Sequence, residues 1–242
     1  MNKSSFGSHF TVTTWGESHG KALGAVIDGC PAGLSLSEED IQKFLDRRKP
    51  GQSRYTTARK EGDLVEILSG VFEGKTTGTP ISLMVRNTDQ RSRDYGNISQ
   101  TYRPGHADFG FDSKYGFRDY RGGGRSSGRE TIGRVAAGAI AAKILKELGI
   151  TLQAYTSSIG PISCHSYHPE IIRENAFYMP DMVAAEKAAQ YLEQCMKEED
   201  SAGGVIECRI NGVPAGIGDP VFGKLDAAFA QSLMSIGAVK AV

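Results

Sequence analysis

The sequence lacks any apolar run long enough to cross a lipid bilayer, and no signal-peptide core follows its first five residues. Its four cysteines are scattered and show no Cys-x-x-Cys spacing. A paired zinc site is therefore not expected, and a chain of 242 residues rarely depends on a disulfide framework. We expect reduced thiols, no bound metal, no membrane partner and a cytoplasmic location.

Net charge is also absent, because 28 basic residues balance 28 acidic ones. No global field therefore attracts the chain to nucleic acid. The basic residues are concentrated locally instead. Six of them and no acid lie between positions 47 and 60, and five arginines beside two acids lie between 118 and 134. Together with 30 glycines, these clusters predict local binding sites for anions, without a close pair of acids for proton transfer.

Apolar periodicity predicts an α+β protein in which sheets pack against helices. Helices are expected from an N-cap at Ser37 to about Arg48, and over residues 130–148, 181–197 and 224–235. Strands are expected over residues 8–15, 22–28, 64–72, 80–85, 151–162 and 204–210. Residues 87–129 show little periodicity and are expected to form a long loop. We expect one domain over residues 1–242, and the apolar end, 237–242, suggests a fold that stops short.

Two short motifs place a histidine in a turn. Gly16-Glu17-Ser18-His19-Gly20 matches the Gly-x-Ser-x-Gly pattern of serine hydrolases, but that pattern needs a following helix, and residues 22–28 are predicted as a strand. The motif then presents a hydroxyl and an imidazole side by side, or is a turn with a solvent-facing histidine. Arg103-Pro104-Gly105-His106-Ala107-Asp108 sets a second histidine after a rigid turn, with catalytic and surface roles equally open.

The most specific motif is the run from Arg121 to Arg129, Arg-Gly-Gly-Gly-Arg-Ser-Ser-Gly-Arg. Three glycines allow successive backbone N–H groups to point inward as a nest, and two serines add hydroxyl donors. The helix predicted just after the run adds the positive end of its dipole. Arg125 and Arg129 supply forked donors suited to phosphate or carboxylate. The run predicts an anion-binding loop; the alternative is a flexible linker with solvated arginines.

Several of these motifs, in this order, resemble the chorismate synthase family. The resemblance rests on residues 16–20 and 28–31, 45–48, 53–55, 76–78, 103–108, 114–120 and 122–131, and it extends from Phe10 to Val242. It implies the family's β-α-β sandwich and a homotetramer. It also implies a carbon–oxygen lyase that converts 5-enolpyruvylshikimate 3-phosphate to chorismate and phosphate by 1,4-anti elimination. This is the last step of the shikimate pathway, which feeds aromatic amino-acid biosynthesis, and it requires reduced FMN.

The resemblance also implies roles for individual residues. The substrate-binding residues are Arg48, Arg54, Arg103 and Arg129. His19 protonates the leaving phosphate, His106 protonates the reduced flavin, and Ser18 and Ser127 belong to a polar relay around flavin N5. The FMN contacts are Arg125, Ser126, Ser127, Gly128, Gly237 and Ala238.

Two further implications concern the length of the chain and the source of reduced flavin. Family sequences continue beyond Lys240, so we expect a C-terminally incomplete chain. The alternative function is an inactive remnant that binds only flavin or substrate.

Some members of the family reduce flavin with NADPH. No dinucleotide-binding fingerprint is visible here, so an external flavin reductase is favoured.

Overall fold

The computed structural model describes residues 4–53, 55, 61–88, 99–121 and 123–242. The chain divides into two compact units. The first comprises residues 1–50, 59–144 and 215–242, and the second comprises residues 51–58 and 145–214. This division does not test the expectation of one domain over residues 1–242, which stays a prediction. No helix in the described ranges has the length and apolar character needed to span a membrane.

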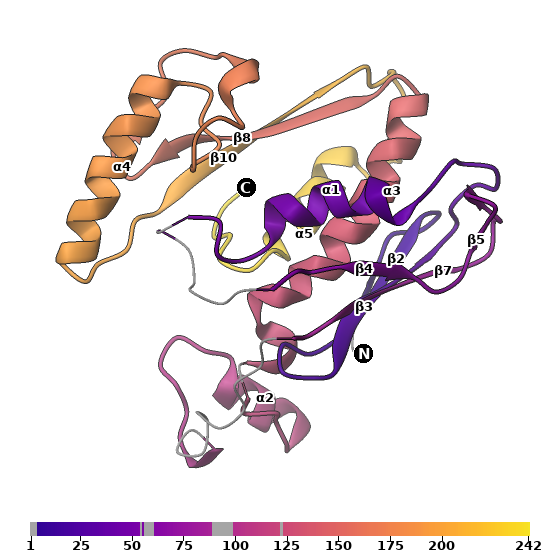
Figure 1. The fold of residues 1–242 in the computed structure, drawn as a ribbon, viewed down its shortest axis with the longest axis horizontal. Coiled ribbons are helices and arrows are strands. Elements are labelled where there is room, and N and C mark those ends of the chain that lie inside the picture. Colours follow the sequence, from indigo (N-terminus) through magenta and orange to yellow (C-terminus); the bar gives the residue numbers. More distant parts are fainter. Residues whose placement is uncertain (1–3, 54, 56–60, 89–98, 122) are drawn as a thin grey trace. The chain divides into compact units, whose positions relative to one another are not determined.

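The first unit contains a five-stranded antiparallel sheet in the order β1-β2-β3-β7-β4, together with a two-stranded β5-β6 ribbon (Figure 1). The strands are β1 (Ser5–Phe6), β2 (Thr11–Gly16), β3 (Ala22–Asp28), β4 (Val65–Ile67), β5 (Val71–Phe72), β6 (Lys75–Thr76) and β7 (Ile81–Arg86). The helices are α1 (Glu38–Arg48), α2 (Asp108–Tyr115), α3 (Thr131–Glu147) and α5 (Leu225–Met234), with 3-10 turns η2 (Gly124–Ser126) and η3 (Gly128–Glu130). The end of α3, residues 145–147, belongs to the second unit.

Two sequence-based expectations for this unit need correction. The strand predicted over 64–72 is divided into β4 and β5, because the chain bends at Gly70, whose φ of +81° and contact with Ile81 leave no room for a side chain. The loop predicted over 87–129 contains α2, whose apolar residues show no helical periodicity. Polar contacts anchor this helix instead, because the first-turn residue Asp108 binds Arg103 and Arg118.

The core of the first unit lies between one face of the sheet and the helices α1 and α3. Alternate residues of β3 and β7 are buried there in register, as the pairings Leu23↔Val85 and Ala25↔Leu83 show. The helices contribute Ile41, Leu45, Ile132, Ala136 and Ile140 to the same cluster. α1 begins with the expected cap, since Ser37 and Asp40 form a capping box. Asp40 also binds Lys143 of α3 at 2.6 Å, which ties the two helices together.

The first turn of α3 packs directly on backbone of the sheet. A Cβ atom on Gly133 would lie 2.7 Å from the carbonyl oxygen of Gly24 in β3 and 2.9 Å from Cγ2 of Thr14 in β2. Only a glycine permits this approach. It holds the N-terminus of α3, and the glycine-rich loop before it, against the strands that carry the histidine turn.

Replacing Gly133 with alanine should therefore destabilise the protein by about 1–3 kcal/mol, as overpacking of a close contact does. The matched control is Gly138→Ala in the same helix, where a Cβ meets nothing within 4 Å. Because Gly138 is exposed, that change should stabilise the protein by up to about 1 kcal/mol through helix propensity alone. Urea unfolding of both variants measures the difference, and equal stabilities would contradict the close packing.

The second unit contains an antiparallel sheet in the order β10-β8-β9 and the helix α4 (Met182–Lys197). Its strands are β8 (Thr151–Ile159), β9 (Ile162–Ser163) and β10 (Gly204–Asn211), and η4 (Pro169–Ile171) is a single 3-10 turn. The predicted strand over 151–162 is interrupted at Gly160, whose φ is +53°. The small core joins Met179 and the alanines of α4 to apolar residues of β8 and β9.

Asp181 caps α4 and gives this unit a specific pH dependence. Its buried carboxylate accepts N–H groups of His165, Ser166 and Ala184, and these hydrogen bonds, the one from His165 first, lower its pKa to about 2. A lowered pKa stabilises the fold above the unfolded value of 3.8, and that contribution disappears as pH falls through about 2.

Replacing Asp181 with asparagine should remove about 2 kcal/mol at neutral pH. The difference from wild type should shrink as pH falls from 4 toward 2. Chemical unfolding across this pH range measures it. The control is Asp200→Asn, an exposed residue of the same unit, which should change little. A pH-independent difference for Asp181→Asn would contradict the role given to the charge.

Candidate active site

The turn between β2 and β3 buries a serine–histidine pair. Ser18 is 1% exposed and His19 is 8% exposed, and Ser18 Oγ lies 3.0 Å from His19 Nδ1. Gly20 N–H donates to the carbonyl of Glu17 and closes the turn. The turn joins two antiparallel strands, so it is not the strand-to-helix elbow of a serine hydrolase. The burial of His19 also contradicts the interpretation of a solvent-facing histidine.

The glycine-rich loop lies against the strand that leads into this turn. Gly123 and Gly124 both have left-handed backbone. The N–H groups of Gly124, Ser126 and Ser127 donate to carbonyls of the loop itself, so these three groups do not point inward as the predicted nest requires. Arg125 donates from Nη1 to the carbonyl of Gly16 and from Nη2 to the carbonyl and hydroxyl oxygens of Thr14. The arginine predicted to contact FMN thus holds the loop on β2, and its contact with flavin stays a prediction. Gly122 lies outside the described residues.

The two serines of the loop turn toward its backbone. Ser126 Oγ donates to the carbonyl of Gly123 at 2.7 Å, and Ser127 Oγ accepts from the N–H of Arg129 at 3.4 Å as the cap of η3. Thr131 Oγ1 donates to the carbonyl of Gly128 at the start of α3. The turns precede α3 as predicted, and anion binding by the loop stays a prediction. The contacts of Arg125 with β2 and of Arg129 with Asp63 contradict the alternative of a linker with solvated arginines.

Two of the predicted substrate-binding arginines share one buried carboxylate. Asp63 has a fully buried side chain and lies 2.7 Å from Nη1 of Arg48 and 3.1 Å from Nη2 of Arg129. Arg48 also donates to the hydroxyl of Thr131 and the carbonyl of Gly128. Glu61, also fully buried, lies 4.0 Å from Arg129. Two cations and two anions are therefore paired beside the N-terminus of α3.

One amide joins this ion cluster to the histidine turn. Asn87 Oδ1 accepts from Nε of Arg129 at 3.0 Å, while Nδ2 donates to the carbonyls of Glu17 and Gly20. Ser18, His19, Arg48 and Arg129 are thereby brought into one network. Asn87, Glu61 and Asp63 were missed from sequence. Their segments carry no motif, and the only available signal was two acids directly after the basic stretch.

The second histidine motif lies outside this network. His106 is exposed and its Nδ1 lies 3.0 Å from the carbonyl of Pro104. Because a carbonyl only accepts, Nδ1 carries the proton and Nε2 remains for other partners. Arg103 forms a forked pair with Asp108, and these hydrogen bonds, together with Arg118, hold the pKa of the Asp108 carboxyl well below its usual range. Substrate binding by Arg103 stays a prediction.

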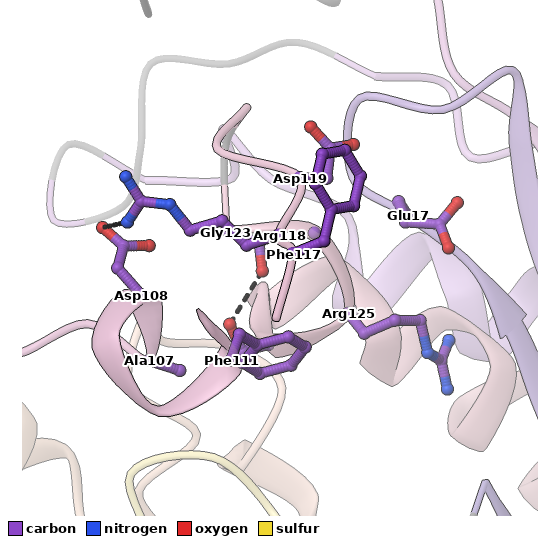
Figure 2. Close-up of a pocket in the computed structure, with 11 residues that line it drawn as sticks. Glu17, Ala107, Asp108, Phe111, Phe117, Arg118, Asp119, Gly123 and Arg125 are labelled. Atoms are coloured by element: carbon purple, nitrogen blue, oxygen red, sulfur yellow. Dashed lines mark hydrogen bonds and ion pairs between the residues drawn. The ribbon is translucent and has the colours of Figure 1, made fainter. Parts of the chain in front are cut away.

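A cavity of about 170 Å³ separates α2 from the glycine-rich loop. In Figure 2, Arg118 reaches Asp108 on one side of the cavity, and Glu17 and Arg125 lie on the other. Phe111 and Phe117 provide an apolar wall. Asp119, also in the wall, has a lowered pKa, first because Arg121 donates to it and to a smaller extent because His19 is near. The cavity therefore has charged ends and an aromatic side.

The remaining predicted residues are placed as follows. Gly237 and Ala238 are exposed, and Ala238 has a φ of +70°. They follow Ser235, which accepts hydrogen bonds from Arg134 of α3 at its hydroxyl and carbonyl oxygens. Arg54 lies outside the described residues. Among the residues that are described, no three His, Cys, Asp or Glu side chains are grouped as metal ligands would be.

The fold and site define an α+β protein with a buried histidine and paired arginines beside a glycine-rich loop. Comparisons with known proteins agree on one family. The chorismate synthase family model matches residues 10–242. Chorismate synthases of Lachnoclostridium phytofermentans and Agathobacter rectalis are 66% and 65% identical over 99% of this chain. A crystal structure of a chorismate synthase, 34% identical, superposes with a TM-score of 0.79 over 96% of this chain. The chain belongs to the chorismate synthase family.

The similarity extends over the chain but not over the whole of its relatives. The chain spans 66% of the length of these two curated relatives and 67% of the chain in the crystal structure. The predicted family and α+β class are confirmed, with antiparallel sheets packed against helices. The roles of individual residues stay predictions.

Proposed function

We propose that this chain acts in the conversion of 5-enolpyruvylshikimate 3-phosphate to chorismate and phosphate, with reduced FMN as cofactor. The observation that carries the proposal is the network that joins His19 to Arg129 and Arg48, in a chain of this family. The substrate has one phosphate and two carboxylates. Guanidinium groups beside a helix N-terminus are suited to bind such a molecule.

Arg129 supports the proposed role in substrate binding. Its guanidinium is 5% exposed, and its Nη1 has no hydrogen-bond partner among the described residues. A buried donor without an acceptor costs free energy. An oxygen of a bound anion would satisfy it. We assign Arg129 and Arg48 to substrate binding on these contacts. Arg54 and Arg103 are assigned to substrate binding by resemblance alone.

His19 is assigned to the leaving phosphate. Ser18 interacts with Nδ1 of the imidazole, and we assign the proton transfer to Nε2. As the bond between carbon and the phosphate oxygen breaks, the proton on Nε2 passes to that oxygen and neutralises part of its new charge. A histidine is suited to this proton transfer near neutral pH.

The proposed flavin-binding residues fit a flat, anionic cofactor. A Cβ atom at Gly128 or Gly237 would meet nothing within 4 Å, so a ring system can approach the backbone there. Ser126 is exposed, and Ser126 and Ser127 provide hydroxyl groups, with Ser18 and Ser127 assigned to the relay near N5. His106 has Nε2 available for proton exchange with the flavin. When bound, reduced FMN supplies electrons to the substrate and takes them back, so the overall reaction is redox-neutral.

The proposal includes a cytoplasmic homotetramer supplied with reduced flavin by an external reductase or by NADPH. The test is anaerobic incubation of the chain with substrate and reduced FMN, following chorismate and phosphate release together. Stoichiometric formation of both products supports the proposal.

The second candidate is binding of flavin or substrate without turnover. Titration with FMN and substrate separates the two functions. Binding without product supports the second candidate, and neither binding nor product refutes both.

A further inference from the structure

The carboxamide of Asn87 has all its hydrogen-bonding groups engaged between two parts of the proposed site. Its oxygen accepts from Arg129 Nε at 3.0 Å. Its nitrogen donates to the carbonyl of Gly20 at 2.8 Å and to that of Glu17 at 3.0 Å. The amide orientation follows from chemistry, because the guanidinium only donates and the two carbonyls only accept. No other side-chain type of this size satisfies all three contacts.

The backbone fixes where this carboxamide sits. Asn87 follows β7 directly, and its N–H donates to the carbonyl of Lys21, which extends the β3–β7 ladder by one bond. The next residue, Thr88, donates from its N–H and its hydroxyl to Glu61. The side chain therefore projects from a rigid strand end rather than from a loose loop, and its three partners have fixed positions.

We infer that Asn87 is a positioning residue that sets the distance between the turn carrying His19 and the guanidinium of Arg129. The two carbonyls it holds flank the serine–histidine pair on both sides, at positions 17 and 20. Arg129 has a buried Nη1 without a hydrogen-bond partner among the described residues. This inference rests on the proposed function, in which His19 is the proton donor and Arg129 binds the substrate. The carboxamide of Asn87 connects the two.

The decisive variant is Asn87→Asp, which keeps the shape of the side chain. One carboxylate oxygen still accepts from Arg129, but the other now faces two carbonyls without a proton to donate. The turn is released while Arg129 keeps its partner. We expect kcat to fall by about 10- to 100-fold, since small misplacements of a catalytic group have effects of this size. KM should change by less than about threefold, because substrate binding is retained.

A second variant separates the two ends of the link. Asn87→Ala also frees Nε of Arg129, so KM should rise by about tenfold in addition to the loss in kcat. The matched control is Asn211→Asp, the same chemical change at an exposed end of β10, which should leave both constants unchanged.

A spectroscopic measurement tests the inference without turnover. The chain has five histidines, so the imidazole resonances of His19 can be assigned by replacing each in turn. Asn87→Asp should shift or broaden the His19 signals and leave those of the exposed His168 in place. Unchanged His19 signals, or a kcat within about twofold of wild type, overturn the inference. If the wild-type protein forms no chorismate, the proposed function is refuted. The spectra of His19 then test the positioning role of Asn87 without any activity measurement.

Discussion

Replacing His19 with alanine is expected to lower kcat for chorismate formation by about two to four orders of magnitude, the usual contribution of a general acid. The imidazole is 8% exposed and its Nδ1 lies beside Ser18, so its position in the turn is constrained. Single-turnover measurements of phosphate release report the step directly, because the proton is needed as the phosphate leaves.

The control for His19 is His168→Ala in the second unit, where the imidazole is 57% exposed and paired only with Glu170 among the described contacts. This variant should retain full activity. Thermal unfolding of both proteins shows whether His19→Ala stays folded. A folded His19→Ala protein with wild-type kcat would remove His19 from the mechanism.

Replacing Asp63 with alanine is expected to destabilise the protein by about 3–5 kcal/mol. Its carboxylate is fully buried between Arg48 and Arg129, which are 17% and 5% exposed. Removing the shared anion leaves two guanidinium groups close together without their main counter-charge. Asp63 also has a φ of +45°, so the surrounding structure holds its backbone in a left-handed conformation. Urea unfolding at constant ionic strength measures the change.

The surface pair of Asp46 with Lys49 provides the control for Asp63. These side chains are 49% and 40% exposed, and Asp46→Ala should change stability by less than about 1 kcal/mol. Raising the salt concentration should diminish the small effect at Asp46 and leave the effect at Asp63 nearly unchanged, because buried charges are poorly screened. A similar loss for both variants would contradict the buried ion cluster.

Local sequence patterns predict most of the elements and part of the candidate site. The cap at Ser37, the strand over 22–28 and the long helix after the glycine run all have local signals, and each was found. α2 was missed because its stability comes from Asp108 and two arginines rather than from an apolar face. Apolar periodicity does not detect a helix that is stabilised by polar contacts.

The site was predicted where motifs carry it and missed where only tertiary structure does. Ser18 and His19 are adjacent in sequence, so their pairing could be anticipated. Asn87 acts through Arg129, 42 positions away, and no local pattern relates the two. From sequence, Arg125 is predicted only to bind a ligand. In the structure its guanidinium donates hydrogen bonds to two carbonyl oxygens of β2.

The contacts of Arg125 with β2 have a consequence for how the protein folds. They join residues 109 and 111 positions apart, and Thr14 also donates to Glu130 across 116 positions. Contacts this distant in sequence form slowly, because a long stretch of chain must first be closed. On the ribosome the hairpin of β2 and β3 emerges early, but β2 can gain these partners only after residue 130 has been synthesised. We therefore expect the geometry of the proposed site to form late in folding, after the elements that carry it.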